Sequence, residues 1–64
     1  MNATHAYLEL QRKSPEALDA VESMIDQGWS AANVARLLSR KYRTEISRLI
    51  LPAAQLLESR LANL

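Results

Sequence analysis

The chain has 64 residues, no cysteine and a single histidine, His5, and its formal net charge is +1. This composition excludes disulfides and thiolate metal sites, and one histidine alone cannot build a zinc site, so we expect no metal and no cofactor. A domain of this size buries only about 60% of its unfolded surface and commonly needs added support, which favours a homodimer.

Nothing in the sequence indicates a membrane or secretory segment. The longest apolar run, residues 49–54, is too short to cross a bilayer. Residues 1–13 lack the basic start and long apolar core of a signal peptide. We therefore expect a cytoplasmic protein with no membrane partner.

Charge is distributed unevenly along the chain. Residues 1–26 carry two basic and five acidic side chains, a net of −3, whereas residues 27–50 carry five basic side chains and one acidic side chain, a net of +4. Residues 51–64 balance Glu58 against Arg60. Such asymmetry indicates a surface that faces a polyanion, although a solvated helix face would give the same pattern.

Good helix formers dominate the sequence, which predicts an all-α fold: a small bundle of three to four helices in a single domain, residues 1–64. Residues 3–12 fit a helix that starts after a cap at Asn2. Residues 8–11 also alternate like a short strand. We favour the helix, but both interpretations stay open here.

The next helix has clear start and stop signals. Ser14 can cap it, and Pro15 suits its first position. Gly28 fits a left-handed cap at its end. Trp29 should then fold back onto Met24 or Ile25 at the edge of the core.

A further helix should begin directly after Ser30, with its inner face formed by Ala31, Val34, Ala35, Leu37 and Leu38. After a softer break, Thr44 can cap the last segment, and Glu45 suits a first helical turn. Pro52 should kink that segment or break it into two helices.

The stretch from about residue 17 to residue 51 resembles the helix-turn-helix DNA-binding superfamily. Two patterns carry the resemblance: "G-x-S-x-x-x-[IV]-A-x-x-L", matched by residues 28–38, and "T-x-[IV]-S-R", matched by residues 44–48. Ser39 stands where a glycine is often found, and the spacing from Ala35 to Ile46 is one residue longer than usual. Residues 8–38 are also similar, more weakly, to ribbon-helix-helix proteins, in which residues 8–13 would form a strand.

The helix-turn-helix resemblance implies a transcriptional regulator, either a repressor or an autoregulator, that reads double-stranded DNA through the helix starting near Thr44. The implied base-reading residues are Arg43, Thr44, Ser47 and Arg48, with Glu45 beside them. The implied phosphate contacts are Ser30, Asn33, Arg36, Arg40 and Lys41.

The leucine-rich end of the chain, residues 52–63, is the expected dimerisation helix. The candidate side chains are Leu56, Leu57, Leu61 and Leu64 along one face and Leu51 on another, which favours burial between two copies. They could also complete the core of one copy. An alternative function is a helical protein-interaction module whose basic face meets an acidic partner. We expect no enzyme and no small-molecule ligand, because the chain has one histidine, no cysteine and no glycine-rich phosphate loop.

Overall fold

Four α-helices form in a computed structural model of the protein, which describes residues 2–63: α1 (Ala3–Lys13), α2 (Pro15–Asp26), α3 (Ala31–Leu38) and α4 (Thr44–Ala62). The predicted all-α fold is confirmed. Residues 8–13 lie in α1, so the strand alternative for this segment is wrong. The strand that a ribbon-helix-helix protein requires is therefore not formed.

Local side-chain caps explain where three of the helices begin. The Oδ1 atom of Asn2 accepts a hydrogen bond from the backbone N–H of His5 at 2.7 Å. Ser14 Oγ accepts from Ala17 N–H at 3.3 Å, and Ser30 Oγ accepts from Asn33 N–H at 3.2 Å. Each cap satisfies a donor that the first helical turn leaves free, as predicted from the sequence.

The end of α2 is a left-handed turn at Gly28, whose φ is 98°. The N–H of Gly28 bonds to the carbonyl of Ile25, and the N–H of Trp29 bonds to the carbonyl of Met24, both at 3.0 Å. This pair of bonds is the Schellman motif, which needs a residue without a Cβ at the left-handed position. The predicted glycine cap is confirmed.

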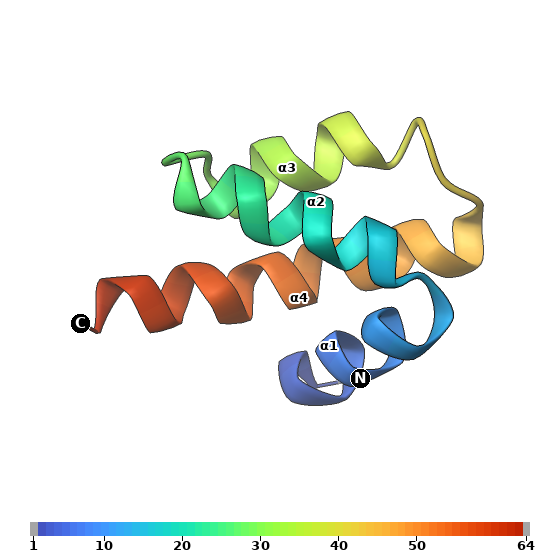
Figure 1. Cartoon of the computed structure of the whole chain (residues 1–64), viewed down its shortest axis with the longest axis horizontal. Coiled ribbons are helices and arrows are strands. Elements are labelled where there is room, and N and C mark those ends of the chain that lie inside the picture. Colours follow the sequence, from blue (N-terminus) through green and yellow to red (C-terminus); the bar gives the residue numbers. More distant parts are fainter. Residues whose placement is uncertain (1, 64) are drawn as a thin grey trace.

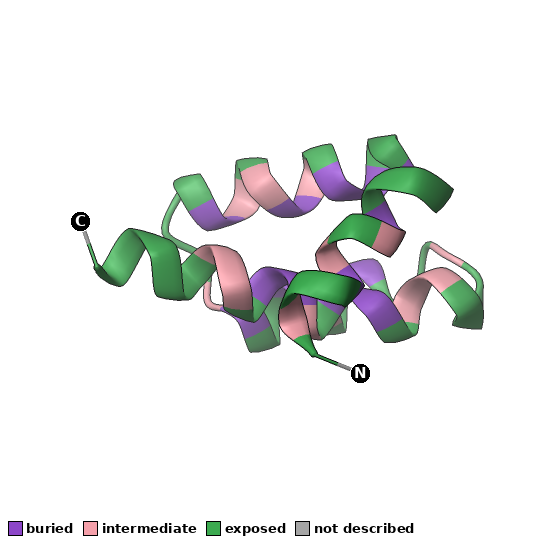
Figure 2. Ribbon diagram, turned by 90° about the horizontal axis from the view of Figure 1, so that it is seen from below, coloured by how far each residue is buried: buried purple, intermediate pink, exposed green. Residues whose placement is uncertain are grey.

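The helices α1, α2 and α3 each pack against α4, and the core lies between α4 and these three helices (Figure 1). In Figure 2 the buried residues line the inner sides of the helices, and the C-terminal turns of α4 are exposed. The core is entirely aliphatic and consists of Ala6, Leu10, Ala17, Leu18, Val21, Ile25, Ala31, Val34, Leu38, Leu49, Ile50, Ala53 and Ala54.

The course of α4 decides between the two alternatives for Pro52 and corrects the prediction for Thr44. The helix continues through Pro52, so the break is excluded, and the predicted reading helix and dimerisation helix are one element. Thr44 is not a cap, because the helix already begins with it. The carbonyl of Arg43 accepts from the N–H groups of Ile46 and Ser47, which makes Arg43 the flanking residue, and no side chain caps this end.

Candidate nucleic-acid interface

The connection between α3 and α4, residues 39–43, is held by hydrogen bonds to both helices. The N–H of Ser39 bonds to the carbonyl of Ala35 at 2.9 Å, and the N–H of Lys41 bonds to that of Leu38 at 3.0 Å. On the other side, Ser47 Oγ donates to the carbonyls of Tyr42, at 2.9 Å, and Ser39, at 3.2 Å. The beginning of α4 is thus fixed relative to the end of α3.

Five basic side chains lie in this connection or in the adjoining turns of α3 and α4, and all of them are exposed: Arg36, Arg40, Lys41, Arg43 and Arg48. The one salt bridge found within residues 2–63 joins Arg12 to Glu9, at 2.8 Å. None of the five basic side chains therefore pairs with a carboxylate in this part of the chain. Glu45 is the acidic side chain of the same stretch. The surface around the connection, which we call the basic face, therefore carries an unbalanced positive charge.

Two of these side chains make contacts within the protein. Arg36 donates a hydrogen bond to Asn33 Oδ1, one turn earlier on α3. The Nζ atom of Lys41 lies 5.7 Å from the centre of the Tyr42 ring, within range of a cation–π contact. These contacts orient the two cations and leave their charge available to a ligand.

The base-reading candidates separate into two groups. Thr44 and Arg48 are exposed and lie one turn apart on the outer side of α4, and Arg43 is exposed directly before the helix. Ser47 is half-buried, and its hydroxyl hydrogen points at the carbonyls of the connection. Arg43, Thr44 and Arg48 are accessible to a ligand, whereas Ser47 holds the turn.

The start of α3 differs from the site that the sequence indicates. The Oε2 atom of Glu58, on α4, accepts a hydrogen bond from the N–H of Ala31 at 3.1 Å. A carboxylate therefore occupies the positive end of this helix, where Ser30 was expected to bind phosphate. The sequence gives no sign of this contact, because the two residues are 27 positions apart.

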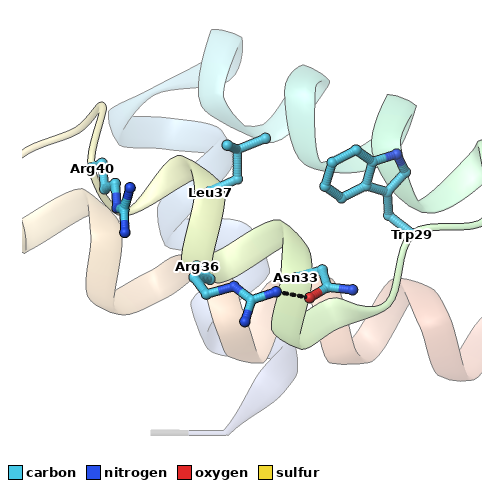
Figure 3. Close-up of a pocket in the computed structure, with 5 residues that line it drawn as sticks. All are labelled: Trp29, Asn33, Arg36, Leu37 and Arg40. Carbon is cyan, nitrogen blue, oxygen red and sulfur yellow. Dashed lines mark hydrogen bonds between the residues drawn. The ribbon is translucent and has the colours of Figure 1, made fainter.

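A groove of about 180 Å³ runs along the outer side of α3, lined by Trp29, Asn33, Arg36, Leu37 and Arg40 (Figure 3). Trp29 is 40% exposed and Leu37 is 47% exposed. The predictions that Trp29 lies at the core edge and that Leu37 faces inward are wrong. Because α3 begins two residues after Trp29, the indole lies along α3, and three of the expected phosphate contacts share this surface with two apolar side chains.

The leucines expected to dimerise lie on different faces of α4, as the helical spacing predicts for Leu51. Leu51 and Leu61 are 39% and 43% exposed, and Leu56 and Leu57 are half-buried. At 100° per residue, Leu51 lies roughly 120° around α4 from Leu57, so the two point in different directions. Leu64 lies outside the described residues.

No helix within residues 2–63 combines the length and the apolar character needed to span a membrane. The same residues contain no group of three or more histidine, cysteine or acidic side chains suited to a metal ion. No protein-family model matches this chain, and no curated protein or solved structure is significantly similar to it. Function is therefore inferred from the chain's own geometry.

Proposed function

We propose that this protein is a sequence-specific DNA-binding transcriptional regulator that binds operator DNA as a homodimer through the beginning of α4. The observation that carries the proposal is the basic face: five exposed cations without carboxylate partners in residues 2–63, gathered around a short connection between two helices. Cations in this arrangement suit a duplex, whose phosphates dominate the affinity of DNA-binding proteins.

The two helices would divide the work as they do in helix-turn-helix proteins. The first turns of α4 enter the major groove, where Arg48 can donate two hydrogen bonds to a guanine. Arg43 and Thr44 lie at the same end and reach neighbouring bases or the backbone. Arg36 and Arg40, on α3, meet the phosphates, and Lys41 does so from the connection.

The geometry of the site changes the roles of two residues that the sequence assigned to DNA contacts. Ser47 is assigned to positioning the turn instead of reading bases, because its hydroxyl hydrogen is used within the protein. Ser30 is assigned to capping α3, because Glu58 brings a negative charge to that helix end. A domain that acts only by occupying an operator is expected to be a repressor or an autoregulator.

The proposal is tested by titrating the protein against duplex DNA, selected from a random pool, at increasing salt concentration. Four phosphate contacts per protomer, from Arg36, Arg40, Lys41 and Arg43, predict a slope of log K against log salt of about −3.6. The variant Arg40→Ala should weaken binding to all sequences about equally and reduce that slope by about 0.9. The variant Arg48→Ala should relax the preference at one base position, a loss of about 1–3 kcal/mol on the selected sequence.

Arg12→Ala is the matched control, because the charge of Arg12 is balanced by Glu9 on α1. It should leave both the slope and the sequence preference unchanged. If the Arg40 and Arg48 variants fold normally and bind DNA as the wild type does, the proposed function is wrong.

A second candidate function is binding to an acidic protein partner. The groove beside α3 favours it, because the exposed side chains of Trp29 and Leu37 line the same groove as Arg36 and Arg40 (Figure 3). An acidic segment with an apolar side chain would fit both features. The DNA titration separates the two candidates, since a protein-interaction module would select no DNA sequence from the pool.

A further inference from the structure

The C-terminal turns of α4 extend past the end of the bundle (Figure 1). The side of α4 that packs on the core through Ile50 and Ala53 continues along these turns with Leu57 and Leu61. Leu57 still packs against the core, but Leu61 is 43% exposed. The apolar stripe of the helix is therefore longer than the surface that the other described helices cover.

Beside this stripe, α2 and α4 form an open groove of about 140 Å³. Its apolar lining comes from Ile25 on α2 and from Leu57 and Leu61 on α4. Its charged lining comes from Glu22 and Asp26 on α2 and from Arg60 on α4. An apolar floor with charges at its margin is the usual composition of a protein–protein interface.

The charges of this groove are arranged by sign. The acidic side chains stand on the α2 side and the basic side chain stands on the α4 side. None of the three forms a salt bridge within residues 2–63, and the guanidinium of Arg60 lies 5.7 Å from the centre of the Tyr7 ring. Such a surface complements itself, because a two-fold rotation about an axis along the groove places each positive side against a negative side.

We propose that a second copy of this chain occupies the α2–α4 groove. In this two-fold dimer, Leu57 and Leu61 of each copy pack against those of the other, and Arg60 of each copy lies opposite Glu22 and Asp26 of the other. The inference deepens the proposed function by naming the dimer surface, but the association itself does not require DNA.

Leu51 has no part in this surface. It lies on the outer side of α4 among polar neighbours, between Arg48 one turn before and Gln55 one turn after, both exposed. Its exposed fraction, 39%, is close to the 43% of Leu61. The two leucines are thus matched in type, helix and exposure, and they differ in the face that they occupy.

The test is sedimentation equilibrium of the full chain over a range of concentrations, without DNA. The wild type should associate to dimers. The variant Leu61→Ser should raise the dimer dissociation constant about tenfold or more, as loss of a central apolar contact does, and Leu51→Ser should leave it unchanged. A wild type that stays monomeric, or a dimer weakened by Leu51→Ser and not by Leu61→Ser, overturns the inference.

Charge reversal tests the two-fold pairing itself. The single variants Arg60→Glu and Asp26→Lys should each weaken the dimer, because each brings like charges together at two symmetric places. The double variant should recover most of the lost dimer affinity, because it again places opposite charges across the interface, with the basic side chain now on α2 and the acidic one on α4. Circular dichroism confirms that each variant is folded. A double variant that is weaker than both single variants rules out this pairing.

The outcome is independent of the test of DNA binding. Dimers that bind no DNA would leave the inference standing and overturn the proposed function. Sequence-specific DNA binding by a chain that is monomeric both free and on the duplex would overturn the inference and leave only the DNA-binding part of the proposed function standing.

Discussion

The hydroxyl of Ser47 links the first turn of α4 to the connection that precedes it. One hydrogen is directed at two carbonyls, those of Tyr42 and Ser39. Removal of the Ser47 hydroxyl leaves the partly buried carbonyl of Tyr42 with one hydrogen-bond donor fewer. We expect Ser47→Ala to lower the free energy of unfolding by about 1 kcal/mol, measured by urea denaturation, and to loosen the basic face.

Ser59→Ala is the matched control for this prediction. Ser59 lies on the same helix and is exposed, and no hydrogen bond of its hydroxyl is found within residues 2–63. Both substitutions gain about the same helix propensity, so the difference between them reports the hydrogen bonds. Equal stability of the two variants would show that the Ser47 contacts contribute nothing.

Single residues also show which features a sequence can predict. The caps at Asn2, Ser14 and Ser30 and the turn at Gly28 follow from side chains that act on their own backbone within a few positions. The prediction for Trp29 is wrong because the direction of its indole depends on where α3 lies after the turn. The contact from Glu58 to Ala31 requires α4 to return beside α3, and no local pattern encodes that.

At the scale of an element, Pro52 is the unusual feature of α4. It lies well inside a helix of 19 residues and has no N–H to donate to the carbonyl of Arg48. Burial of Leu49, Ile50, Ala53 and Ala54 on either side of it holds the helix together. The helical spacing of apolar residues on both sides of Pro52 is visible in the sequence. Helix propensity alone does not show whether the free energy gained by burying them exceeds the cost of the proline.

Replacing this proline should therefore stabilise the protein. We expect Pro52→Ala to raise the free energy of unfolding by about 2 kcal/mol, because it restores a helix hydrogen bond and removes a ring clash. The gain in flexibility of the unfolded chain offsets part of this effect. Gln55→Ala, at an exposed position one turn later, should change stability by only a few tenths of that amount. A destabilised Pro52→Ala variant would mean that packing of the proline ring outweighs its cost to the backbone.

At the scale of the whole molecule, α4 joins two proposed surfaces. Its first turns carry Thr44 and Arg48, and its last turns carry Leu57 and Leu61. Of the features at the two ends, the sequence predicted the basic side chains and the terminal leucines. It could not predict that Ile25 and Asp26 of α2 complete the groove, because that depends on how α2 packs on α4.

The charge pairing of the proposed dimer fixes the relative direction of its two α4 helices. Arg60 of one copy lies opposite Glu22 and Asp26 of the other only if the two-fold axis runs along the groove, so both α4 helices run in the same direction. Packed helices lie about 8–10 Å apart, so the two reading ends lie side by side at one end of the dimer. Successive major grooves on one side of a duplex, about 34 Å apart, are beyond this separation.

The selected operator should therefore contain two half-sites that adjoin each other within one turn of the duplex. Inserting about 5 base pairs between them places the second half-site on the opposite side of the duplex, out of reach of the second reading end. We expect this insertion to reduce the affinity to that of a single half-site, measured by titration at fixed salt. Two half-sites about 10 base pairs apart, centre to centre, would require α4 helices that run in opposite directions, and would therefore exclude the proposed charge pairing in the α2–α4 groove.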